Sequence, residues 1–111
     1  MAKAKQKNQP RSVELDLNNP EFQAGLFALQ NAEKLLALDM LRKVAQLTWD
    51  QVHRDKGLRW EKILSVTPDP ATKADAYYSI RISRGRRAIA YRDGNIMRMV
   101  SIPPDHDSTY Q

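Results

Sequence analysis

The residues of this chain best suited to acid–base chemistry lie in its last eleven positions, SIPPDHDSTYQ. His106 stands between Asp105 and Asp107, and Tyr110 follows four residues later. Neighbouring carboxylates favour the protonated imidazolium, so His106 is a candidate general acid. The double proline ahead of it is expected to end the last strand and turn the tail back over a sheet. The same aspartates would repel a phosphate, and a hydrophilic terminus without a role is the alternative.

A second group of candidates is an arginine-rich block near the C-terminus. Residues 77–100 hold six arginines and a single aspartate, within a chain of net charge +5. A guanidinium binds a phosphate through two parallel hydrogen bonds and also stacks on bases. The block therefore predicts binding of RNA phosphates or of an acidic protein, with a solvated basic face as the alternative.

The amino-acid composition excludes several classes of site. The 111 residues are enough for one domain, and 41% hydrophobic with 28% charged content is typical of a globular protein. Cysteine is absent, which excludes disulfides, thiolate catalysis and cysteine-bound zinc. His53 and His106 lack the spacing of metal ligands, so we expect no metal and no cofactor. We find no membrane-spanning run and no signal peptide, so we expect a cytoplasmic protein.

The N-terminal half predicts an arm, a strand and helices. Residues 1–12, rich in lysine, predict a disordered basic arm, and residues 13–111 a single domain. VELDL at 13–17 alternates as a short half-buried strand does. Asn19 before Pro20 predicts the start of a helix that reaches about residue 30.

Two more helices are expected before the sheet. Asn31 is a possible cap of a helix over about 32–47, with an apolar stripe formed by Leu35, Leu38, Leu41, Val44, Ala45 and possibly Leu36. Thr48 and Gln51 match a capping box for a short helix ending near Lys56, where Gly57 is expected to supply a left-handed turn. Residues 58–66 predict a strand or an irregular edge.

The last third predicts an antiparallel β-meander. A two-residue Asp93-Gly94 turn would pair Tyr91 with Ile96, Ile89 with Arg98 and Arg87 with Val100. One face would then carry Ala88, Ala90, Met97 and Met99 and pack on the helices.

The preceding turn has two possible lengths. A two-residue Arg84-Gly85 loop would place Arg81 opposite Ala88, on the helix side. A three-residue loop through Arg86 places Arg81 opposite Ile89 and Ile82 opposite Ala88, which keeps Ile80 and Ile82 in the core, so we favour it. The open face of the sheet then carries Arg81, Arg87, Arg98, Ile89, Tyr91, Ser79 and Ser83.

The stretch YYSIRISRGRRAIAYRDGNIMRMVSI, residues 77–102, resembles the β-meander of the RelE/ParE superfamily of bacterial toxins. The likeness is strongest at SIRISRGRRAIAYR and, with the strand and helical hairpin ahead of it, covers most of residues 13–110. It implies an α+β fold in which a short strand and a helical hairpin plus a short helix precede a meander packed on the helices. It also implies a toxin neutralised by an antitoxin protein.

The resemblance further implies roles for individual residues. RelE-type toxins cleave mRNA on the ribosome without a metal, using basic residues of the strands and residues near the C-terminus. On this chain Arg81 and Arg87 would hold and stabilise the phosphate, His106 would move a proton, and Tyr110 would stack on a base or assist proton transfer. Arg98 and Tyr91 would add RNA contacts.

Two further interpretations stay open. A ParE-type toxin of the same fold would act on DNA gyrase instead of RNA. A member that has lost catalysis would bind RNA or the ribosome only.

Overall fold

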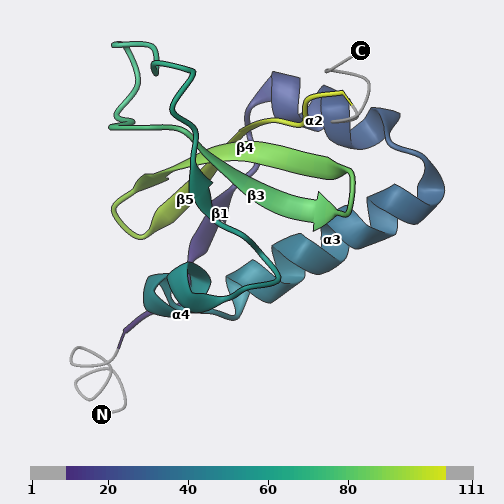
Figure 1. Ribbon diagram of the computed structural model, residues 1–111, viewed down its shortest axis with the longest axis horizontal. Helices are drawn as coiled ribbons and strands as arrows, with labels where there is room; N and C mark the ends of the chain where they lie inside the picture. The colour runs from purple at the N-terminus through teal and green to yellow at the C-terminus, as the bar shows by residue number, and fades with distance from the viewer. Residues whose placement is uncertain (1–9, 105–111) are drawn as a thin grey trace.

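The structure is a computed structural model that describes residues 10–104. A five-stranded sheet lies against a helical layer, and α3 runs across one face of the sheet (Figure 1). Strand order is β1-β5-β4-β3-β2, with β1 parallel to β5 and the other pairs antiparallel. In chain order the elements are β1 (Glu14–Asp16), α2 (Pro20–Ala28), α3 (Asn31–Ala45), α4 (Trp49–Arg54), β2 (Glu61–Lys62), β3 (Tyr78–Ser83), β4 (Arg86–Asp93) and β5 (Ile96–Ser101). The predicted α+β architecture is confirmed.

Side-chain caps begin two of the helices as predicted. Asn19 accepts from the backbone N–H of Glu21 at 2.8 Å, and Pro20 occupies the first helical position. Thr48 and Gln51 form both bonds of the capping box. The prediction for Asn31 is wrong, because α3 already includes it and begins after Gln30.

The short helix also ends differently from the prediction. α4 stops at Arg54, and the Asp55 side chain accepts the N–H groups of Gly57 and Leu58. Gly57 has no positive φ; the left-handed residue of this segment is Arg59, at φ 51°. These two hydrogen bonds hold the turn after α4 through the Asp55 side chain, without a left-handed glycine.

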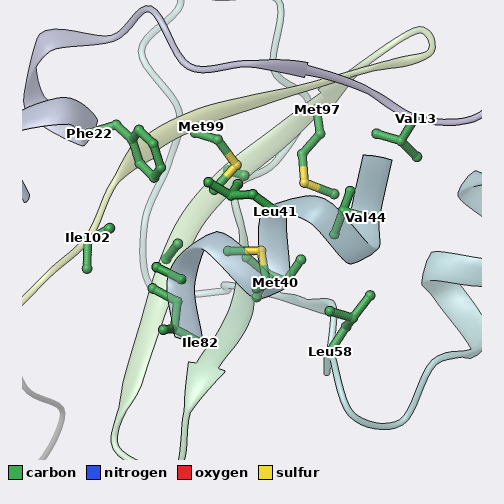
Figure 2. Close-up of a cluster of buried hydrophobic side chains, with 14 of the residues drawn as sticks. Val13, Phe22, Met40, Leu41, Val44, Leu58, Ile82, Met97, Met99 and Ile102 are labelled. Atoms are coloured by element: carbon green, nitrogen blue, oxygen red, sulfur yellow. The ribbon is translucent and has the colours of Figure 1, made fainter. Parts of the chain in front are cut away.

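The core lies between the helices and the sheet, where Met97 and Met99 of β5 face Leu41 and Val44 of α3 (Figure 2). The residues of α3 that are buried are Ala37, Met40, Leu41 and Val44. Leu35, Leu36 and Leu38 are instead exposed, by 64%, 43% and 52%. A leucine-rich helix carries several possible apolar stripes. The buried one keeps Leu41 and Val44 of the predicted stripe, and has Ala37 and Met40 in place of the three exposed leucines.

The β4–β5 register differs from the prediction by two residues. The turn is Gly94-Asn95, so Asp93 lies opposite Ile96 and Tyr91 lies opposite Arg98. Gly94 takes φ +61°, which suits the first position of a two-residue hairpin loop. The three predicted pairs, Tyr91–Ile96, Ile89–Arg98 and Arg87–Val100, are therefore wrong. An even shift leaves each side chain on its predicted face.

The β3–β4 hairpin has the two-residue Arg84-Gly85 loop, with Ser83 opposite Arg86. A bulge between Arg81 and Ser83 keeps Ile80 and Ile82 buried as predicted. The predicted place of Ser83 on the open face is wrong, because Ser83 lies beyond the bulge and its hydroxyl donates to Glu33 of α3 at 3.5 Å. The predicted partners are wrong: Arg81 lies opposite Arg87, and Ile80 lies opposite Ala88. The bulge thus places two arginines side by side on the open face.

The first strand is held at both of its sides. It pairs with β5, and Ser12 just before it forms an isolated bridge with Thr48. The Asn95 side chain also donates to the Ser12 carbonyl at 2.8 Å. Ser12, at the end of the predicted arm, therefore lies against the folded domain, while residues 1–9 lie outside the described residues.

Candidate RNA-binding face

The open face of the sheet brings Arg81 and Arg87 together. The two residues are direct cross-strand partners, and both are half-buried. Directly opposite residues of an antiparallel pair share a face and lie within about 5.5 Å at their Cα atoms. Two like charges in this position are unfavourable in the absence of an anion. The pair is therefore the feature of this face best suited to a phosphate.

Arg87 is held through one nitrogen of its guanidinium. Nη1 donates to Ser79 Oγ at 2.8 Å and to the Arg59 carbonyl at 3.4 Å, and it lies 3.6 Å from a carboxylate oxygen of Glu61. Within residues 10–104, neither Nε nor Nη2 of Arg87 makes a hydrogen bond. The edge that would bind a phosphate through two hydrogen bonds remains free of protein partners there.

Arg81 has fewer contacts. Its Nε donates to the Ser83 carbonyl at 3.4 Å, and within the described part of the chain no carboxylate pairs with it. Arg81 thus supplies the less neutralised charge of the pair.

Arg98, unlike Arg81 and Arg87, is paired with two carboxylates. Its Nη1 lies 2.6 Å from Asp16, and its Nε lies 2.8 Å from Asp93. These two carboxylates raise the pKa of Arg98, while the pKa of Asp16 is lowered by the Asn18 backbone N–H and by Arg98. Arg98 links β1, β4 and β5, and its charge is compensated.

An aromatic pair lies beside this ion-pair network. The rings of Tyr77 and Tyr91 are 6.0 Å apart at their centroids and inclined by 29°. Burial raises the pKa of Tyr91, which moves the ionisation of its hydroxyl still further above neutral pH. Tyr91 and Ile89 were predicted on this face, and Tyr77 packs beside Tyr91.

His106 and Tyr110 lie outside the described residues, so their predicted roles stay predictions. The chain leading toward them is described as far as Pro104. Ile102 is buried against Gly25 of α2, and the Pro103 carbonyl accepts from Arg86 at 3.3 Å. Arg86 also pairs with Glu33 at 3.1 Å, so its charge serves the anchoring of this segment to α3.

Three residues around Arg87 were not predicted from the sequence. Glu61 and Arg59 belong to a segment without periodicity, and β2 is only two residues long. Ser79 was placed on the open face, but its bond to Arg87 depends on the bulged register. Nothing in the local sequence indicates these contacts.

The described residues hold neither a metal-type cluster of side chains nor a membrane-spanning helix. Between residues 10 and 104 no three His, Asp or Glu side chains cluster as metal ligands would. No helix in that range has the length and hydrophobicity to cross a bilayer.

Among the solved structures that are similar to this chain is one described as "The structure of YoeB dimer from Staphylococcus aureus". It is similar over 82% of this chain and 94% of that chain, with a TM-score of 0.49 and 16% identity. No family model and no curated protein matches. At this distance the likeness says nothing of which residues act, so the fold and the site rest on this chain's own geometry.

Proposed function

We propose that the protein is a RelE-like toxin of a toxin–antitoxin pair that binds and cleaves mRNA on the open face of its sheet. The observation that carries the proposal is the cross-strand pair of Arg81 and Arg87 on a floor that includes Tyr91. Its support from the sequence is the resemblance of residues 77–102 to the meander of that superfamily. The described elements have the order that this resemblance implied.

The arginine pair suits the charge that develops during RNA cleavage. Attack of a 2′-hydroxyl on the neighbouring phosphate produces a dianionic phosphorane. Two preorganised guanidinium groups stabilise that charge more than the single negative charge of the ground state. Arg81 and Arg87 are therefore assigned to the phosphate, and no metal is invoked.

Two proton transfers complete the reaction. The 2′-hydroxyl must lose its proton, and the leaving 5′-oxygen must gain one. Glu61 is the described carboxylate nearest the arginine pair, 3.6 Å from Arg87, and is the candidate base. His106 is the proposed acid, and Tyr110 the proposed stacking residue.

The expected partners are an antitoxin, the ribosome and mRNA, in the cytoplasm. A protein partner is favoured by an apolar surface on the helical hairpin, defined by Phe27, Leu35 and Leu38, which are 69%, 64% and 52% exposed. Exposed apolar patches of this kind mark protein–protein contacts.

Primer extension on a defined mRNA, with and without programmed ribosomes, tests the proposal. We expect cuts at A-site codons in the presence of ribosomes, and their loss in Arg87→Ala and His106→Ala. Cuts that persist in Arg87→Ala would contradict the assignment of the pair. If cuts are lost in Arg87→Ala but persist in His106→Ala, His106 is not the general acid.

The exposed apolar surface also favours a second candidate, a ParE-type toxin that acts on gyrase. Absence of cleavage under both conditions, together with inhibition of gyrase supercoiling, would favour that function. Absence of both activities, with RNA binding retained, would indicate a non-catalytic RNA- or ribosome-binding protein.

A further inference from the structure

The segment between α4 and β2 contains an unusual backbone conformation. Arg59 has φ 51°, and among residues 10–104 it is the only residue other than glycine with a positive φ. A side chain with a Cβ adopts this region at an energetic cost, so surrounding contacts must hold it. Gly57, which would adopt it freely, lies two residues away and does not.

Both sides of Arg59 are anchored. Before it, the Leu58 N–H donates to Asp55, and the Leu58 carbonyl accepts from the Arg81 N–H at 2.8 Å. After it, the ring of Trp60 stacks on Tyr78 with centroids 4.6 Å apart. The direction of the chain between these anchors is therefore set at Arg59.

The left-handed turn places two acceptors beside Arg87. The Arg59 carbonyl accepts from Arg87 Nη1, and Glu61, two residues on, lies 3.6 Å from the same nitrogen. The other carboxylate oxygen of Glu61 lies 3.3 Å from the Arg59 guanidinium. Ser79 supplies the remaining contact. Together these acceptors fix one nitrogen of Arg87 and leave Nε and Nη2 facing no partner among the described residues.

We propose that Arg59 is a positioning residue: its left-handed backbone aims the guanidinium of Arg87 at the phosphate. The inference rests on the proposed function in taking RNA as the source of that phosphate. The backbone of Arg59 orients Arg87 in this proposal, whereas the side chain of Arg59 acts only through Glu61. The conformational preference at position 59 should therefore control how well Arg87 binds.

The test compares substitutions that remove the same side chain and differ in their tolerance of a positive φ. Arg59→Gly and Arg59→Asn tolerate it, whereas Arg59→Val opposes it. Arg59→Ala, with a smaller penalty, replaces the valine variant if that variant does not fold. Each full-length protein is titrated with a short single-stranded RNA carrying 2′-O-methyl groups, which prevents cleavage, at a temperature where circular dichroism shows it folded.

We expect the glycine and asparagine variants to bind within about twofold of the original protein. The valine variant should bind about five- to tenfold more weakly, as loss of a well-placed charge-assisted contact predicts. Equal weakening by glycine and valine would overturn the proposal and assign the effect to the side chain. Equal binding by all of them would overturn it as well.

A second readout separates this inference from the proposed function. The Nε–H signal of Arg87 in ¹⁵N NMR spectra reports the order of its guanidinium without any RNA. It should keep its position in Arg59→Gly and shift or broaden in Arg59→Val. If Arg87→Ala binds RNA as well as the original protein, the proposed function fails, and this NMR comparison still decides whether Arg59 positions Arg87.

Discussion

Arg87 and Arg98 are both arginines on the open face of the sheet, and their neighbours give them different roles. Arg98 lies between two carboxylates, Asp16 and Asp93, that are only 22% and 21% exposed. Arg87 lies 3.6 Å from Glu61, which is 52% exposed, so this ion pair is more strongly screened by solvent. The sequence predicted RNA binding by both arginines; under the proposed function, Arg87 is the better phosphate ligand of the two because its charge is less compensated.

Alanine substitutions of these two arginines should therefore change different properties, RNA affinity for Arg87 and the free energy of unfolding for Arg98. Arg87→Ala should weaken binding of single-stranded RNA about tenfold and change the free energy of unfolding little. Arg98→Ala should lower the free energy of unfolding, because it removes both ion pairs, and leave RNA affinity within about twofold. Fluorescence anisotropy and urea unfolding measure the two quantities. The reverse pattern would contradict the assignment.

The ion pairs of Arg98 also make the free energy of unfolding depend on pH. Hydrogen bonds from the Asn18 backbone and from Arg98 lower the pKa of Asp16 in the folded state. Its stabilising effect is therefore complete above the ordinary pKa of an aspartate, about 3.9, and is lost as the pH falls through the lowered folded value. Asp16→Asn should be less stable at pH 7, and its deficit should shrink below about pH 4. Urea unfolding at several pH values between about 2.5 and 7 measures this deficit, and a deficit that does not change with pH would contradict the role of the Asp16 charge.

At the scale of elements, the turns decide what the sequence could and could not predict. The order of strands and helices, two of the caps and the buried face of the meander followed from alternation and helical spacing. The registers did not, because Gly94 serves a turn one residue later than expected and a bulge near Ile82 compensates a shorter loop. Both corrections leave the apolar residues on their predicted face and move only Ser83 to the helix side, which is why hydrophobic alternation could not detect them.

Alanine substitutions of Gly94 and Gly57 test which glycine needs a positive φ. Gly94→Ala should lower the free energy of unfolding by about 1 kcal/mol through its positive φ, since no atom lies within 4 Å of the added Cβ. Gly57→Ala is the matched control. Its Cβ would meet only the ends of the Asp55 and Lys43 side chains, so it should cost less than about 0.5 kcal/mol. A larger loss at Gly57 would show that this glycine, rather than Arg59, supplies the left-handed turn.

Helix α3 shows a second limit of sequence reasoning. Its leucines were expected to form the core, yet Leu35 and Leu38 face outward while Ala37 and Met40 are buried. Hydrophobicity alone cannot choose among stripes when most of a helix is apolar. The choice depends on how closely α3 approaches the sheet, and that is a property of the whole fold.

At the scale of the molecule, the basic charge is divided between binding and structure. Arg86 pairs with Glu33 and Arg98 with two aspartates, whereas Arg81 has no carboxylate partner in residues 10–104. The net charge of +5 therefore overstates what the open face offers to RNA. Under the proposed function, the phosphate site is the cross-strand pair of Arg81 and Arg87.

The salt dependence of RNA binding should reflect this division. Each phosphate contact on a single strand contributes about 0.7 to the slope of log affinity against log salt concentration. The double variant Arg81→Ala/Arg87→Ala should lower the slope by about 1.4, and Arg98→Ala by less than about 0.3. RNA titrations at KCl concentrations from about 50 to about 300 mM measure this slope for each variant. An equal change in all variants would indicate that charge acts without regard to position.

The pairing of β1 with β5 has a consequence for the order in which the protein is made. Arg98 bonds to Asp16 across 82 positions, and β1 has no other strand as its neighbour in the sheet. β1 leaves the ribosome before β5 does, so it cannot pair until β5 has been synthesised. Contacts between such distant segments form late in folding. The finished sheet therefore forms only after β5 has left the ribosome, and under the proposed function a nascent toxin without β5 lacks that sheet.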